Sequence, residues 1–205
     1  MLDHVAYGVP DLDAACHELA ERLGVRPMPG GQHRGLGTHN AILALGESVY
    51  LEVIAPDPNQ PPPSRPRPFG LDALVDPRLV AWAAKAPDIE SRVERARSAG
   101  YDPGDVIKLG RELPDCGRLD WRLTFPDELA GDGLVPFLID WGSTPHPSIT
   151  APQGCSLLSL RGEHPQPELV TRQLQALEVD LNLAPGPAAA LIATLMTPKG
   201  EVELR

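Results

Sequence analysis

Two ionisable side chains stand in mostly apolar, strand-like runs of this sequence. His4 lies in LDHVAYGV, and Glu52 lies in YLEVI. An imidazole and a carboxylate can form an acid/base pair, and both can ligate a divalent metal ion. Each also has a structural explanation, because a histidine on a strand can simply be packed and a buried glutamate can be neutralised by an arginine such as Arg122.

Four more polar side chains occur in runs of the same kind. Thr38 and Asn40 lie in THNAILALG, Arg122 lies in RLDWRLTFP, and Asp140 lies in LVPFLIDWG. Hydroxyl and amide groups can hydrogen-bond to a small molecule, and a guanidinium can hold a carboxylate or phosphate. Asp140 can supply a further carboxylate, although it can equally cap the turn at 141–142. All of these residues need a fold that brings them together.

A repeated order of elements provides that fold. The first strand-like run is followed by Pro10-Asp11, by a helix with apolar residues at helical spacing, and by alternating runs that predict a β-hairpin. Pro87-Asp88 stands at the matching place in a second copy of this β-α-β-β-β order. The expected division is a first module at 1–56, a proline-rich linker at 57–78, a second module at 79–142, a linker at 143–154 and a shorter βαβββ-like third module at 155–205.

Composition and charge exclude several classes of function. The formal net charge of −10, without a lysine or arginine cluster, argues against a nucleic-acid partner. No apolar stretch is long enough to cross a membrane, and Cys16, Cys116 and Cys155 show no paired spacing. We therefore expect a cytoplasmic protein without a membrane or nucleic-acid partner. Hydrolase, nucleotidase and dehydrogenase motifs of the GxSxG, P-loop and GxGxxG types are missing from the sequence.

The tandem β-α-β-β-β order, with a histidine in the first strand and a glutamate in the last strand of the first module, resembles the vicinal oxygen chelate superfamily. That superfamily includes glyoxalase I and the extradiol dioxygenases. The runs LDHVAYGVPDLDAA, GLGTHNAILALG, YLEVIAP and LVPFLIDWGSTPHPS are similar to those of its glyoxalase-like domain proteins. The resemblance covers about residues 1–150. It implies an α+β fold whose tandem modules form an open, curled mixed sheet, with helices on the convex side and a metal or substrate in the concave side, the cup.

Strand alternation predicts which side chains of the first module face the cup. The apolar set of the first strand is expected to face the helix, so that His4 faces the cup. The same reasoning places Glu52, Thr38 and Asn40 in the cup, and it turns His39 away from it. His4 could then meet Glu52.

In the second module the large apolar residues are again assigned to the helix side. Trp121 and Phe137 belong to that set, which leaves Arg122 and Asp140 for the cup. Alignment of the two Pro-Asp pairs places Ala81 where His4 stands in the first module. The superfamily usually has a metal ligand at that position, and this chain has none.

Two kinds of function follow from the resemblance. In the first, the protein is a lyase, isomerase or dioxygenase that acts on a small oxygenated molecule through His4 and Glu52. A divalent ion (Zn, Mn, Fe or Ni) would be held by His4, Glu52 and Asp140. In the second, the protein binds a small molecule without turnover or without a metal, through Thr38, Asn40 and Arg122. The third module is expected either to cover the end of the barrel or to pair with its counterpart in a homodimer.

Overall fold

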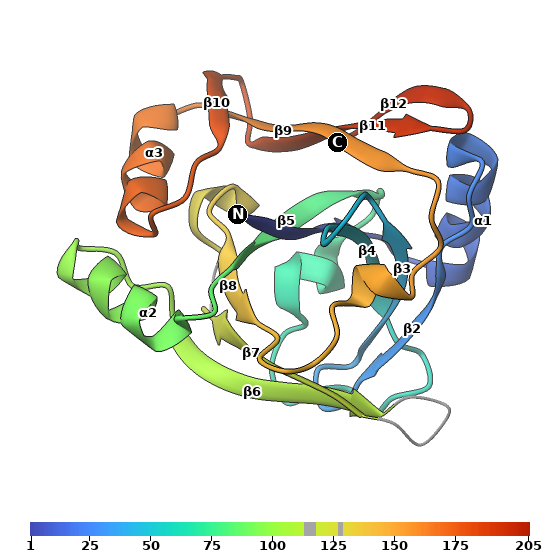
Figure 1. Ribbon diagram of the computed structural model, residues 1–205, viewed down its shortest axis with the longest axis horizontal. Helices are drawn as coiled ribbons and strands as arrows, with labels where there is room; N and C mark the ends of the chain where they lie inside the picture. The colour runs from blue at the N-terminus through green and yellow to red at the C-terminus, as the bar shows by residue number, and fades with distance from the viewer. Residues whose placement is uncertain (113–117, 127–128) are drawn as a thin grey trace.

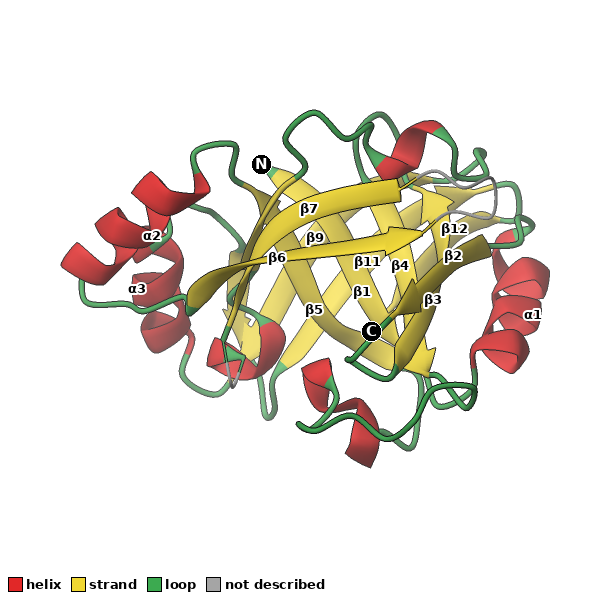
Figure 2. Cartoon of the chain, turned by 90° about the horizontal axis from the view of Figure 1, so that it is seen from below, coloured by secondary structure: helices red, strands yellow, loops and turns green. Residues whose placement is uncertain are grey.

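The structure, a computed structural model, describes residues 1–112, 118–126 and 129–205. Over these residues the strands form a sheet of eight in the order β2-β3-β4-β1-β5-β8-β7-β6 and a sheet of four in the order β10-β9-β11-β12. The larger sheet is strongly curled, and the helices lie on its outer side (Figures 1 and 2). The α+β architecture expected from the sequence, a curled mixed sheet with helices on the convex side, is therefore confirmed.

The first module contains β1 (Leu2–Gly8), α1 (Leu12–Leu23), β2 (Met28–His33), β3 (Thr38–Ala44) and β4 (Tyr50–Pro56). Helix α1 begins where the Asp11 carboxylate accepts a hydrogen bond from the Ala14 amide, and it ends at Gly24 in the left-handed conformation. Strands β1 and β4 pair in parallel, so β1 lies beside the last strand of its own module.

The 3-10 helix η1 (Pro68–Ala73) precedes the second module, which contains β5 (Arg78–Lys85), α2 (Ile89–Ser98), β6 (Asp105–Glu112), β7 (Arg118–Phe125), η2 (Ala130–Gly133) and β8 (Phe137–Asp140). Strands β5 and β8 again pair in parallel. The antiparallel pairing of β1 with β5 joins the two modules at the middle of the sheet, with Ala6 opposite Ala81.

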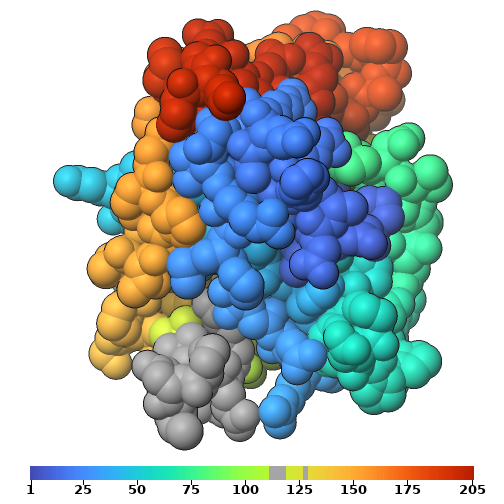
Figure 3. Space-filling model, turned by 90° about the vertical axis from the view of Figure 1, so that its right-hand side faces the viewer, coloured from blue at the N-terminus to red at the C-terminus, as the bar shows by residue number. Residues whose placement is uncertain are grey.

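The third part of the chain contains η3 (Pro147–Ile149), β9 (Ser156–His164), α3 (Pro167–Ala176), β10 (Asn182–Pro185), β11 (Ala190–Thr197) and β12 (Gly200–Leu204). Its strands pair differently from those of the other modules, because β9 lies between β10 and β11. This smaller sheet covers the convex side of the larger one, and its β11–β12 hairpin lies over α1 (Figures 1 and 3).

Apolar clusters pack on both sides of the curled sheet. The largest cluster packs both modules' helices and the smaller sheet against β1 and β5, and it includes Leu19, Trp82 and Leu195. A second cluster lies inside the curl and includes Ala81 and Phe137. Part of the inside of the curl is therefore apolar too.

Two expectations from the sequence concern membrane-spanning segments and cysteine pairing. Within the part of the chain that the structure describes, no helix is long and apolar enough to cross a membrane. Cys16 and Cys155 are buried free thiols, whereas Cys116 lies outside the described residues.

Candidate functional site

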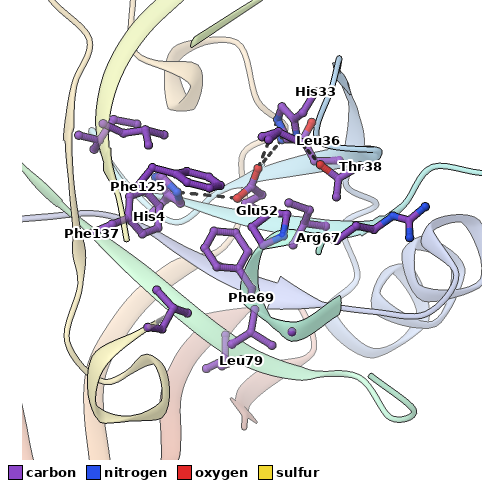
Figure 4. Close-up of a pocket in the computed structure, with 18 of the residues that line it drawn as sticks. His4, His33, Leu36, Thr38, Glu52, Arg67, Phe69, Leu79, Phe125 and Phe137 are labelled. Atoms are coloured by element: carbon purple, nitrogen blue, oxygen red, sulfur yellow. Dashed lines mark hydrogen bonds and ion pairs between the residues drawn. The ribbon is translucent and has the colours of Figure 1, made fainter. Parts of the chain in front are cut away.

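The curled sheet encloses a cavity of about 1240 Å³ on its concave side. Its polar wall is built by the first module. Its apolar wall comes largely from the second module and from η1 (Figure 4). The polar lining residues of the first module are His4, His33, Thr38, Asn40 and Glu52.

His4 and Glu52 face each other at this polar wall. Only 3% of His4 and 7% of Glu52 is exposed, and His4 Nε2 lies 3.8 Å from Glu52 Oε2. Tyr50 stacks on the imidazole at a ring-centroid distance of 4.6 Å. The alternation argument places these two side chains on the cavity side, and the structure does so as well.

Asp3 fixes the orientation of the His4 ring. The Nδ1 of His4 lies 2.8 Å from Asp3 Oδ1, and the carboxylate is completely buried. Adjacent residues of a regular strand point to opposite faces, but the pairing of β1 with β5 shifts register between Leu2 and His4. At this irregularity in the pairing, Asp3 reaches the side chain of its neighbour. With Nδ1 held by Asp3, Nε2 is the nitrogen that faces Glu52.

Two further donors reach Asp3 from the segment that follows β8. Trp141 Nε1 donates to Oδ2 at 3.1 Å, and His146 Nε2 lies 3.2 Å from the same oxygen. His146 Nδ1 accepts from the Ser148 amide, so its Nε2 carries the proton that is donated to Asp3. Burial by itself raises the pKa of Asp3, but the hydrogen bonds from His146 and His4 outweigh it, and the pKa lies well below its ordinary value.

Asn40 and His33 surround the other oxygen of Glu52. Asn40 Nδ2 donates to Glu52 Oε1 at 2.6 Å, and His33 Nε2 lies 3.9 Å from that oxygen. His33 Nδ1 is 3.0 Å from Thr38 Oγ1 (Figure 4). Thr38 and Asn40 therefore line the cavity together with Glu52.

In the second module, β7 and β8 turn toward the cavity the face that was expected to meet the helix. Trp121 and Phe137 line the cavity, together with other aromatic and aliphatic residues of β7 and β8. The expectation assumed that the more apolar face of a strand meets a helix. The inside of the curl is also apolar, so hydrophobicity did not distinguish the two faces.

The positions predicted for Arg122 and Asp140 are therefore corrected. They pair with each other across β7 and β8 on the helix side, where Arg122 also contacts Glu90 of α2, and neither lines the cavity. Asp140 Oδ1 accepts from the Gly142 amide at 2.8 Å, which is the turn-capping alternative. The expected ion pair between Glu52 and Arg122 does not form either.

Strand register shows which residue corresponds to Glu52 in the second module. Glu52 pairs with Ala6, which lies two residues after His4 in β1. Phe137 pairs with Ala83, which lies two residues after Ala81 in β5. If Ala81 corresponds to His4, Phe137 therefore corresponds to Glu52. The second module therefore has an apolar residue where the first module has this carboxylate. No group of three histidine, cysteine, aspartate or glutamate side chains among the described residues is arranged to hold a metal ion. The three-residue metal site expected from the sequence does not fit these residues.

Comparisons with known proteins agree with this architecture. A family model for the glyoxalase-like domain matches residues 2–178. The chain belongs to the glyoxalase-like domain family. A hypothetical protein from Staphylococcus aureus has a similar structure, with a TM-score of 0.64, 15% sequence identity, and coverage of 98% of this chain and 83% of that chain.

Methylmalonyl-CoA epimerases resemble this glyoxalase-like protein more weakly. The epimerase from Mycobacterium tuberculosis gives a TM-score of 0.42 with 21% identity, covering 67% of this chain and 84% of that chain. A Streptomyces coelicolor epimerase in complex with 2-nitronate-propionyl-CoA gives 0.45 with 15% identity, covering 72% and 98%. A search of the curated proteins finds no match. The glyoxalase-like family expected from the sequence is confirmed by the family model.

The site of this glyoxalase-like protein also contains residues that the sequence did not single out. Asp3, His33 and His146 are not among the site residues expected from the sequence. The proline-rich segment at 57–78 was expected to be a linker, yet its Phe69 lies in the cavity and stacks on Phe137. Phe69 has a φ of 61°, a conformation rare for a bulky residue, and such residues are frequent at functional sites.

Proposed function

We propose that this glyoxalase-like protein is an enzyme of the vicinal oxygen chelate type that transfers a proton on a small oxygenated molecule. His4 and Glu52 would act as the acid/base pair. The observation that carries the proposal is the pair itself, an imidazole nitrogen and a carboxylate 3.8 Å apart on the wall of a large, mostly apolar cavity.

The surrounding contacts support a division of roles. Asp3 holds Nδ1 of His4, which leaves Nε2 on the side of Glu52. Asn40 holds one oxygen of Glu52 and leaves the other toward His4. A substrate held against these groups would lose a proton from one of its atoms to one group and gain a proton at another atom from the other group, which would produce an isomerisation.

Proton transfer between His4, Glu52 and a substrate does not require a complete set of metal ligands. The dioxygenase alternative depends on a metal ion, and the ligand set expected for that ion is separated by the sheet, because Asp140 lies on the helix side. Proton transfer by His4 and Glu52 is therefore the reaction that the described residues support best.

Arginine side chains supply a binding role that was expected of Arg122. Arg65, Arg67, Arg78 and Arg205 line the cavity in a protein of strongly negative net charge. Arg78 lies at the start of β5, where β1 ends, and the Leu79 amide next to it donates to the Arg205 carbonyl. A carboxylate or phosphate on the substrate would be attracted to this end of the cavity.

Hydrogen exchange at carbon tests the proposed chemistry. The probe is α-hydroxyacetophenone, which has an apolar ring, a carbonyl, a hydroxyl and acidic hydrogens on one carbon. In D₂O, the wild-type protein should accelerate the loss of the signal of these hydrogens from the proton NMR spectrum. His4→Ala and Glu52→Gln should each reduce the acceleration by at least about 100-fold, the usual contribution of a general acid or base.

The control variant is Glu47→Gln, which removes a carboxylate from the exposed β3–β4 turn. It should exchange at the wild-type rate. Equal rates for wild type, His4→Ala and Glu52→Gln would refute the proposed roles.

The second candidate is a binding protein without turnover. It is favoured by the wholly apolar character of the second module's wall at β8, where Phe137 stands at the position corresponding to Glu52. This candidate predicts that the probe binds in the cavity while its hydrogens exchange at the rate measured without protein.

A further inference from the structure

We propose that Phe69 sets the length of the molecules that the cavity admits, because its ring stands between two parts of the cavity. The near compartment is the part lined by His4 and Glu52, and the far compartment is the part lined by Arg78 and Leu191. The inference concerns the size of a bound molecule and not its reaction, so it goes beyond the proposed function. It is carried by the contacts of the Phe69 ring, by the backbone of Phe69 and by a clamp that holds its turn.

The cavity extends well beyond the near compartment. Its far compartment is lined by Arg78 at the start of β5 and by Leu191 of β11. Arg78 pairs with Gly8, four residues beyond His4 along β1. Four residues of a strand span about 13 Å. The far compartment therefore lies too far from His4 for a compact molecule to occupy both compartments at once.

The Phe69 ring lies between the two compartments. It stacks on Phe137 with the ring centroids 5.8 Å apart, and Phe137 meets the His4 ring edge-on at 5.4 Å. In the view of Figure 4, Phe69 lies between Glu52 and Leu79, and both of these residues also line the cavity. A long molecule that is held beside His4 therefore meets this ring before it reaches the start of β5.

The backbone of Phe69 has a conformation that its side chain disfavours. Its φ is 61° and its ψ is 19°, in the left-handed region, where a bulky residue is an outlier. Gly70, which follows it, has a φ of 68° and could adopt this region without strain. Such strain persists only where the surrounding structure fixes it, and it is frequent at ligand clamps and switch regions. The strain is therefore tied to the position of the ring inside the cavity.

Arg67 and Asp72 clamp the turn that carries Phe69. The amide and the guanidinium of Arg67 both donate to the Asp72 carboxylate, at 2.8 and 2.6 Å. Arg67 Nε also donates to the Gly37 carbonyl at 2.8 Å, which ties this turn to the turn between β2 and β3. The Asp72 side chain is 43% exposed and lies outside the cavity lining, so the clamp can be tested without changing the cavity wall.

Two probes of different length test the inference. α-Hydroxyacetophenone and its 4′-butyl derivative differ only in the alkyl chain that lengthens the molecule. By isothermal titration calorimetry, the wild-type protein should bind the butyl derivative about 10-fold or more weakly than the shorter probe, because the alkyl chain meets the Phe69 ring. In Phe69→Ala the order should be reversed by about 10-fold or more, because the alkyl chain enters an apolar space that the ring had filled.

Three further variants separate the ring from the stability of the fold. Phe69→Leu keeps an apolar side chain in η1 and should give a preference between those of wild type and Phe69→Ala. Asp72→Ala releases the clamp but keeps the ring, and it should weaken the preference of the wild type for the shorter probe. The control is Val75→Ala, which shortens a side chain just after η1 that is 80% exposed, and it should keep the wild-type preference.

A crystal structure of Phe69→Ala with the butyl derivative gives an independent measurement. It should place the alkyl chain beside Leu79, on the far side of the position that the ring occupies in the wild type. An alkyl chain in any other part of the cavity would contradict the inference.

The binding results decide the role of Phe69 by themselves. If the wild-type protein binds the butyl derivative as tightly as the shorter probe, or if Phe69→Ala and Phe69→Leu keep the wild-type preference, that role is refuted. Failure of every variant to bind either probe would refute it as well. If Asp72→Ala keeps the full preference, the clamp does not hold the ring in place. Hydrogen exchange that is absent although both probes bind as expected would count against the proposed function and leave the role of Phe69 standing.

Discussion

Replacement of Asp3 by asparagine should destabilise this protein and misalign His4. The carboxylate accepts from three side chains, His4, Trp141 and His146, and none of its surface is exposed. Asparagine has nearly the same shape, but it offers one acceptor oxygen and places an NH₂ group where the second oxygen was. At least one donor therefore loses its acceptor, and the indole of Trp141 has no other protonation state with which to adapt.

The expected cost is about 2–3 kcal/mol, since a buried polar group without a partner costs about 1–3 kcal/mol and hydrogen bonds to a charged group lie at the upper end. For a chain of this length, that cost lowers the midpoint of thermal unfolding by roughly 5–10 °C. Because the pKa of Asp3 is below its ordinary value of 3.8, its ionisation stabilises the fold above about pH 4. That contribution is lost as the pH falls below this value, so the difference between wild type and Asp3→Asn should shrink in acid.

Urea unfolding at pH 7 and pH 3 measures how much unfolding free energy Asp3→Asn loses and whether that loss shrinks in acid. Asp76→Asn, which removes the same charge from an exposed residue before β5, is the control and should unfold like wild type. If Asp3→Asn lies within about 0.5 kcal/mol of wild type at pH 7, the range of an ordinary surface substitution, the network of Asp3 contributes no stability and the reasoning is wrong. A cost that grows in acid would refute the assigned charge state.

Two further predictions follow from the site. Arg122→Ala should leave the affinity for α-hydroxyacetophenone unchanged within about 2-fold, because Arg122 lies on the helix side of the sheet. A loss of affinity of about 10-fold or more, measured by calorimetry, would show that Arg122 contributes to the site. Removal of divalent metal ions by dialysis against a chelator should leave hydrogen exchange of the same probe unchanged, because His4 and Glu52 have no third protein ligand beside them among the described residues. If exchange is lost and is then restored by Zn²⁺, Mn²⁺, Fe²⁺ or Ni²⁺, a metal ion takes part in the reaction.

The order of the elements could be predicted from the sequence because it depends on local patterns. The Pro-Asp pairs, the helical spacing of apolar residues and the alternation in the strands recur in both modules, and each pattern acts over a few residues. In the first module the two faces of a strand differ in polarity, as with His4 and Val5 in β1. Alternation alone was therefore enough to place His4, Glu52, Thr38 and Asn40 on the cavity side.

Tertiary structure decided the rest of the site, for three physical reasons. In β7 and β8 large apolar residues belong inside the curl, where Trp121 lies, so polarity could not show which face meets a helix and Arg122 was misplaced. The pairing of β1 with β5 is irregular between Leu2 and His4, where Asp3 contacts His4. The orientation of the Asn40 amide depends on Glu52, which lies 12 residues further along the chain. The sequence by itself determined which elements form, whereas packing between distant strands determined which side chains meet.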